Sequence, residues 1–174
     1  MTLLTKGDRL PEDFFQGSVA RIKELQRDNG AIPWFDGGVI DPWNHTEAAM
    51  GLAVLGEMQA AERAYAYLMD TQLDDGSWWG ELGSAVPMDE EEQRYTGGEE
   101  GAGKPVRDTN FAAYIATGAW HHFLLTGDKT FLTDIWPHVK KAMEFILAHQ
   151  TEHGDIRWAA DDPHTPEDDA LITG

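Results

Sequence analysis

The 174-residue sequence contains no cysteine, few basic residues and no long apolar run. Without cysteine there is no disulfide, thiolate zinc site, iron–sulfur cluster or cysteine nucleophile. Lys and Arg number 13 against 31 Asp and Glu, so the formal net charge is −18. Phosphate backbones and anionic membrane surfaces bind clusters of basic residues that this sequence lacks. We therefore expect no nucleic-acid partner and no membrane partner.

The N-terminal residues MTLLTKGDRLPEDFF contain no charged region followed by an apolar stretch, and nowhere do about 18 apolar residues run together. Together with the absence of cysteine, this predicts a cytoplasmic protein. The length lies within the range of roughly 100–200 residues expected of one domain, and 41% hydrophobic content favours a folded core. Seven Trp are many for an acidic chain, and exposed indoles often stack on ligands.

The only periodicity in the sequence is helical, and the helical segments are of two kinds. Three segments are apolar on one face only, which is typical of helices on the outside of a fold: 12–27, 59–72 and 134–149. Two are apolar nearly all round and must be enclosed: 44–57 and 109–125. The alternation predicts an all-α fold of outer and inner helices. Pro137 is tolerable only in the first turn of the last helix.

A short motif recurs at the end of each outer helix: a Gln, a polar turn, a Gly four residues on, and then a Trp. Its copies are Gln26…Gly30…Trp34, Gln72…Gly76…Trp78 and Gln150…Gly154…Trp158. We expect the glycine to supply a positive φ after the helix and the Trp to cover the helix end. All three Trp, and Trp136 in a helical stripe, are therefore interpreted as packing residues.

An aspartate precedes each inner helix. Asp41-Pro42-Trp43 and Asp108-Thr109-Asn110 combine an N-cap residue with the first helical turn, and Pro at the first helical position strengthens the signal in the former. Asp168-Asp169-Ala170-Leu171-Ile172 resembles a third such start.

The alternation of helices resembles the α/α-toroid superfamily of six-hairpin glycosidases, terpenoid cyclases and prenyltransferase-like proteins, and the resemblance covers nearly the whole chain. The Gln…Gly…Trp turns resemble degenerate Gln-Trp motifs of the cyclases. A bacterial branch often labelled prenyltransferase is similar in three stretches: Ala119-Trp120-His121-His122-Phe123-Leu124, Gly127-Asp128 and Ile135-Trp136-Pro137. The resemblance implies that residues 1–174 form a single domain, about half of an (α/α)6 barrel. We expect an N-terminal portion of a longer ring; the alternative is a homo-oligomer whose halves complete each other.

The first inner helix begins with the densest polar and aromatic group of the sequence. Hydrolysis of a glycoside without a covalent intermediate needs one protonated carboxyl and one carboxylate that activates water. We assign Asp41 as the general acid and Asp108 as a second catalytic candidate. The alternative is that both residues only cap their helices. The resemblance leaves room for the general base in the other half of the ring.

The remaining site candidates lie at the starts of the inner helices or beside them. We expect substrate contacts from Asp36, Trp43, Asn44, His45, Glu47, Trp79, Arg107, Asn110 and Tyr114. Residues 80–107 form a segment long enough to be a mouth loop or lid. We expect no metal and no other cofactor, since no His-Glu-x-x-His occurs, and His149 and His153 straddle a helix end.

These features favour an inverting glycoside hydrolase that acts on an α-linked oligo- or polysaccharide, of the α-mannan or α-glucan type. One alternative is a terpenoid cyclase or prenyltransferase-like enzyme. Its Asp-x-Asp-Asp or Asp-Asp-x-x-Asp motif does not occur here, and the protein prenyltransferases that resemble this fold carry a zinc site with a cysteine ligand. The other alternative is a non-catalytic carbohydrate-binding module, which would use the same Trp residues.

Overall fold

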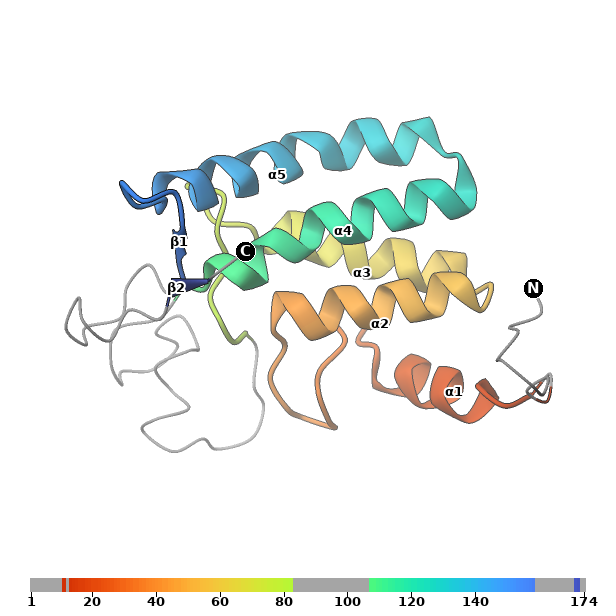
Figure 1. Ribbon diagram of the computed structural model, residues 1–174. Helices are drawn as coiled ribbons and strands as arrows, with labels where there is room; N and C mark the ends of the chain where they lie inside the picture. Colours follow the sequence, from red (N-terminus) through yellow and green to blue (C-terminus); the bar gives the residue numbers. More distant parts are fainter. Residues whose placement is uncertain (1–10, 12, 83–106, 159–170, 173–174) are drawn as a thin grey trace.

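A computed structural model describes residues 11, 13–82, 107–158 and 171–172 of the chain (Figure 1). This part contains five helices and one pair of short strands. The helices are α1 (Gln16–Leu25), α2 (Pro42–Val54), α3 (Met58–Thr71), α4 (Thr109–Thr126) and α5 (Lys129–Ala148). The strands are β1 (Ile156–Arg157) and β2 (Leu171–Ile172), which pair antiparallel.

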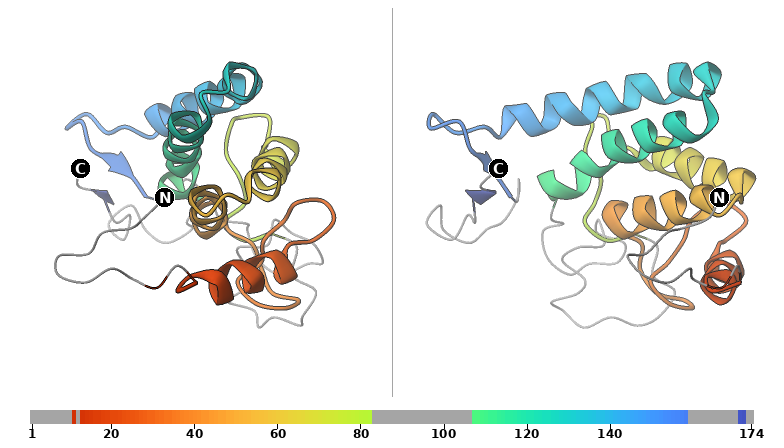
Figure 2. Two further views of the ribbon diagram at one scale, coloured as in Figure 1. Left: turned by 90° about the vertical axis from the view of Figure 1, so that its right-hand side faces the viewer. Right: turned by 45° about the vertical axis from the view of Figure 1, so that its right-hand side comes forward.

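The helices form an arc of hairpins. In Figure 1, α2 and α4 run side by side in the same direction, and α3 and α5 run back the other way. Helix α2 packs against α4 and α3, and α4 also packs against α5, as the view along the helices shows (Figure 2). The predicted alternation of enclosed and two-faced helices is confirmed, and the described part of the chain is almost entirely helical, as predicted.

Small side chains allow these helices to approach closely. Helix α2 buries alanines at 49 and 53, α4 at 112 and 119, and α3 at 60, 61 and 64. Larger apolar side chains fill the space between the helices: Leu52, Leu68, Ile115, Ile135, Val139 and Phe145. Because these residues belong to four helices, they fix the positions of the helix ends that carry the polar groups described below.

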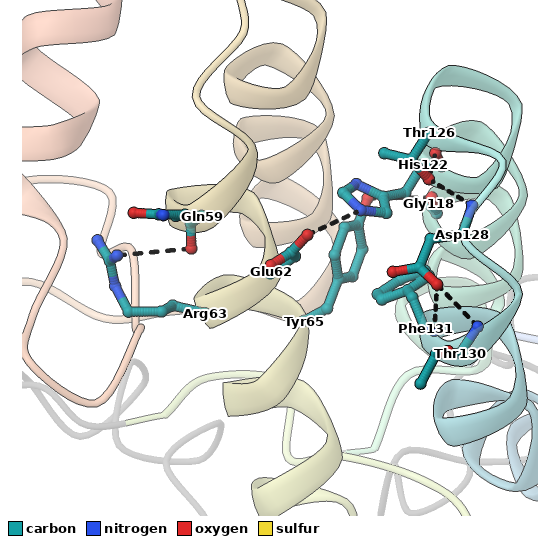
Figure 3. A network of polar contacts seen from close by, with 10 residues as sticks. All are labelled: Gln59, Glu62, Arg63, Tyr65, Gly118, His122, Thr126, Asp128, Thr130 and Phe131. Carbon is teal, nitrogen blue, oxygen red and sulfur yellow. Dashed lines mark hydrogen bonds and ion pairs between the residues drawn. The ribbon is translucent and has the colours of Figure 1, made fainter.

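Three helices meet at Gly118 of α4. The hydroxyl of Tyr65 on α3 donates a hydrogen bond of 3.0 Å to the Gly118 carbonyl (Figure 3). A Cβ at this position would lie 2.4 Å from Cγ2 of Thr46 on α2 and 2.9 Å from a ring carbon of Tyr65. His122, one turn further along α4, is buried against the rings of Tyr65 and Phe131. The site therefore accepts only glycine without movement.

Helix α5 begins five residues earlier than the sequence predicted. Asp128 caps it, because its Oδ1 accepts hydrogen bonds from the backbone N–H groups of Thr130 and Phe131. Pro137 consequently lies inside the helix, and the prediction that it occupies the first turn is wrong. The prediction that Trp136 is a core residue is also wrong: its side chain is 57% exposed, and the neighbouring Ile135 takes the buried position.

The recurring turns have one geometry. Gly30, Gly76 and Gly154 all have φ of 93°, which confirms the predicted positive φ. In each turn the side-chain amide of the preceding Gln donates to the carbonyl of the glycine, at distances of 3.1, 3.0 and 2.7 Å. Each outer helix therefore ends in a closed turn that its own glutamine holds together.

The third predicted helix start is corrected in part. Leu171 and Ile172 belong to β2 and pair with β1, so they do not begin a helix. Asp168, Asp169 and Ala170 lie outside the described residues, as does most of the predicted mouth loop, residues 83–106.

The close contact at Gly118 predicts opposite effects for two helical Gly→Ala substitutions. Gly118→Ala should destabilise the fold by about 1–3 kcal/mol, because the new methyl group overpacks the junction with Thr46 and Tyr65. Gly51→Ala in α2 is the matched control: a Cβ there meets no atom within 4 Å, so it should stabilise by about 0.5–1 kcal/mol. Urea denaturation of both variants measures the difference, and equal effects would contradict the packing described.

Candidate functional site

Asp41 precedes α2 and is fully buried. Its Oδ1 accepts a hydrogen bond of 2.8 Å from the backbone N–H of Asn44, which makes it the N-cap. Its Oδ2 accepts from the side-chain amide of Asn44 at 2.8 Å and from the indole N–H of Trp34. Pro42 at the first helical position fits this start. One carboxylate oxygen thus caps the helix, and the other faces side-chain donors.

Asp108 precedes α4 and repeats this arrangement. Its Oδ1 accepts from the backbone N–H groups of Asn110 and Phe111 at 2.7 and 3.1 Å. Its Oδ2 accepts from the indole N–H of Trp158. The capping role considered for both aspartates is therefore real, and in each case a second oxygen is left for an indole.

The two aspartates lie in one region. Helices α2 and α4 are parallel and begin at the same end of the arc (Figure 1). Just inside that end, the indole of Trp43 on α2 stacks on the ring of Tyr114 on α4, with centroids 5.0 Å apart and an interplanar angle of 21°. Asp41 is close enough for its charge to act on Asp108.

Asp108 binds its proton unusually tightly for a carboxyl group. Burial, and to a smaller extent the negative charge of Asp41, raise the pKa of Asp108 to about 6, although hydrogen bonds from Phe111, Trp158 and Asn110 act in the opposite direction. Because this pKa is higher in the folded chain than in the unfolded one, the contribution of Asp108 to stability falls as the pH rises from about 4 to about 6. A carboxyl group with this property suits proton donation near neutral pH.

The two indoles that bind the aspartates correct the sequence interpretation. Trp34 is 50% exposed and Trp158 is 47% exposed, so neither is a packing residue. Trp78 is a packing residue, since it is buried and its indole N–H donates to the carbonyl of Leu68 at 2.9 Å.

The spacing after the glycine explains this difference. Trp78 is the second residue after its glycine, and the second residue after Gly30 is the buried Ile32. Trp34 and Trp158 are the fourth residues after theirs. All three turns have an apolar residue at the second position, Ile32, Trp78 or Ile156, so an alignment on that position separates Trp78 from the other two Trp in the sequence.

A groove of about 710 Å³ lies between α1 and α2, beside Asp41. Its wall includes Trp34 and Asn44, the two side chains that donate to the Asp41 carboxylate, together with Arg21 and Ile22 of α1. The exposed faces of these donors are therefore open to this space.

His45 was expected to contact substrate, and the structure corrects this. Its ring is buried, with Nδ1 accepting from the backbone N–H of Ile32 at 3.1 Å and Nε2 lying 2.8 Å from the carbonyl of Ala64. Burial lowers the pKa of His45, so the ring is neutral. His45 is a core residue that ties α2 to α3.

Arg107 has a role that the sequence did not indicate. Its guanidinium forms an ion pair with Asp75, in the second of the recurring turns (residues 72–76). It also lies over the ring of Phe145 on α5, 5.7 Å from the centroid. Arg107 thus joins the start of α4 to its neighbours.

The other predicted substrate residues differ in exposure. Asp36, Asn44 and Glu47 are exposed, whereas Trp43, Trp79, Asn110 and Tyr114 are half-buried. The indole N–H of Trp43 is buried and has no hydrogen-bond partner among the described residues. Asn44 binds the carboxylate of Asp41, the backbone of Asn110 binds that of Asp108, and Trp43 stacks on Tyr114. Glu47 lies one turn into α2.

The described residues show neither a metal cluster nor a membrane span. No group of three or more His, Asp or Glu side chains there could hold a metal ion. None of the helices in this part of the chain has the length and apolar character needed to cross a membrane.

The chain is similar in sequence to a protein of named activity. No family model matches the chain. Over 164 residues, 94% of the chain, it is 40% identical to the MMP endo-(1,4)-3-O-methyl-alpha-D-mannosidase of Mycolicibacterium hassiacum. The chain spans about two fifths of the length of that relative, 41%.

Two solved structures are similar in fold. An unsaturated glucuronyl hydrolase specific for heparin has a TM-score of 0.63 at 18% identity, and 92% of the chain covers 44% of it. A sugar epimerase from a ruminal bacterium has a TM-score of 0.59 at 17% identity, and 93% of the chain covers 42% of it. Both are α/α-toroid proteins, so the chain has the fold of slightly under half of such a toroid.

The site predicts how the proton of Asp108 responds to loss of its indole donor. Side-chain carboxyl NMR should show a titration midpoint for Asp108 near pH 6. Trp158→Phe should move this midpoint upward, because the lost hydrogen bond favours the ionised form. Trp120→Phe, which changes an exposed indole on α4, is the control and should leave the midpoint unchanged. A midpoint near 4, or no response to Trp158→Phe, would contradict the assignment.

Proposed function

We propose that this chain supplies the carboxyl pair of an inverting endo-acting glycoside hydrolase that cleaves α-linked mannosides. The observation that carries the proposal is the pair formed by Asp41 and Asp108. Each caps one of two parallel helices, each is bound by an exposed indole, and the charge of one raises the pKa of the other. The similarity to an endo-mannosidase and to a glucuronyl hydrolase supports the same reaction class.

The pair divides the chemistry between its members. Asp108, with a pKa of about 6, holds the proton and donates it to the leaving glycosidic oxygen. Asp41 takes the other role, either to activate water or to stabilise the positive charge that develops on the sugar. This assignment reverses the sequence expectation, in which Asp41 was the acid, because burial and the charge of Asp41 act on Asp108.

The aromatic residues provide a surface for sugar rings. Trp34 and Trp158 hold the carboxylates through their ring nitrogens and leave about half of each side chain exposed. Sugar faces stack on exposed indoles, so both can bind substrate next to the reacting bond. We propose that the substrate is a (1→4)-linked 3-O-methyl-α-D-mannoside oligomer, as for the similar enzyme, whose methyl groups add apolar surface for this contact.

The test uses the native-length protein with a (1→4)-linked 3-O-methyl-α-D-mannan, and follows chain cleavage and the product anomer by NMR. Asp108→Asn and Asp41→Asn should each reduce kcat/KM by about 10²–10⁴-fold, since each removes one half of the acid–base pair. The first product anomer should be inverted relative to the substrate. Asp70→Asn, which changes an exposed carboxylate on α3, is the control and should retain activity.

Three outcomes would contradict the proposal. Binding of the mannan without cleavage would indicate a non-catalytic carbohydrate-binding toroid. Turnover of a prenyl diphosphate in place of the mannan would indicate the cyclase or prenyltransferase class. Full activity in both aspartate variants would show that the two residues only cap their helices.

A further inference from the structure

Thr109 is the first residue of α4, and it is buried. The N-cap carboxylate of Asp108 accepts the backbone N–H groups at the second and third helical positions, so the N–H of Thr109 needs another acceptor. That acceptor is the backbone carbonyl of Trp158, at 2.8 Å. The start of α4 therefore bonds the backbone of the same residue whose indole binds Asp108.

The hydroxyl of Thr109 binds the same backbone. Its Oγ1 donates to the carbonyl of Arg157 at 2.6 Å and also lies 2.9 Å from the carbonyl of Trp158. Because Thr109 is 1% exposed, water does not compete for these bonds. The first residue of α4 thus holds two consecutive carbonyls of a distant segment with its side chain and its main chain.

Trp158 depends on such an anchor because it comes from a distant part of the chain. It lies 50 residues after Asp108 and follows β1, beyond the end of α5. Helix α5 ends where α4 begins, at the same end of the arc (Figure 1). The N–H of Arg157 donates to the carbonyl of His149 at 3.1 Å, and β1 pairs with β2. These bonds tie the segment to the end of α5 and to β2, whereas Thr109 ties it to α4.

The first aspartate site lacks this anchor and has a different one. Pro42 is the first residue of α2, and it has neither a backbone N–H nor a hydroxyl. Trp34 lies only seven residues before Asp41, in the loop that enters α2, and its backbone N–H donates to the carbonyl of Val39 at 3.0 Å. The first indole is therefore placed by its own loop, and the second by contact with the helix start.

We propose that Thr109 is a positioning residue, which holds the indole of Trp158 against the carboxylate of Asp108. It acts through the backbone of residues 157–158, which it fixes at the start of α4. Packing alone does not hold the indole, since nearly half of the Trp158 side chain is exposed. The importance of Thr109 for the reaction rests on the proposed role of Asp108 as the proton donor.

Side-chain carboxyl NMR of the native-length protein tests the proposal. Thr109→Val replaces the hydroxyl with a methyl group of similar size, so the titration midpoint of Asp108 should rise by about half or more of its rise in Trp158→Phe. Thr109→Ser keeps the hydroxyl and should keep the midpoint. Thr126→Val removes a hydroxyl bond to the His122 carbonyl at the other end of α4; it is the matched control and should leave the midpoint unchanged. An unchanged midpoint in Thr109→Val would overturn the proposal.

Two further measurements separate positioning from stability. In the double variant Thr109→Val/Trp158→Phe, the midpoint should equal that of Trp158→Phe alone, because Thr109 acts through the indole. A further rise would contradict this route. In the unmodified protein, the indole N–H signal of Trp158, identified by its loss in Trp158→Phe, should follow the titration of Asp108. A signal that does not follow it would overturn the proposal even if Thr109→Val failed to fold.

Kinetics distinguish this inference from the proposed function. The alkaline limb of kcat/KM for mannan cleavage should move to higher pH in Thr109→Val and stay in place in Thr109→Ser. If the NMR midpoint of Asp108 rises in Thr109→Val while the limb does not move, the positioning role is supported and Asp108 is not the proton donor. If the limb moves while the midpoint does not, Thr109 does not act through the Asp108 carboxylate, and the inference is wrong.

Discussion

The contact between a turn glycine and the backbone of the next outer helix determines the spacing of the whole arc. At Gly30 and Gly76 a neighbouring carbonyl lies about where a Cβ would stand, so only glycine permits the approach. The glutamine of the turn holds the same helix through a second carbonyl. Because α1, α3 and α5 are set by these contacts, the inner helices between them have little freedom in position.

The fixed inner helices bring two aspartates together at one end. A helix start needs a residue that accepts backbone N–H groups, and Asp41 and Asp108 meet this need with one oxygen each. The second oxygen is then held by an indole that lies in the loop after an outer helix. The side chains that cap the helices are also the ones that we propose for the chemistry, and burial of Asp108 beside another carboxylate raises its pKa toward neutrality.

The sequence predicts the helices and their inner or outer class because hydrophobic periodicity reports burial directly. It also predicts both N-cap aspartates, since Asp before a helix has one favoured role. It does not distinguish Trp34 and Trp158 from Trp78, because a Trp after a turn can be buried or can donate to a carboxylate. The sequence also does not predict that His45 is buried. Its ring is held by the backbone of Ile32 and Ala64, which lie in other segments of the chain, so the residues next to His45 do not indicate these contacts.

We propose that Asp108 is the proton donor and that Trp158 adjusts its proton affinity. The pH dependence of kcat/KM for mannan cleavage by the native-length protein, with and without Trp158→Phe, tests it most directly. We expect an alkaline limb, on which kcat/KM falls as Asp108 loses its proton, and this limb should move to higher pH in the variant. A limb at the same pH in both proteins would contradict it.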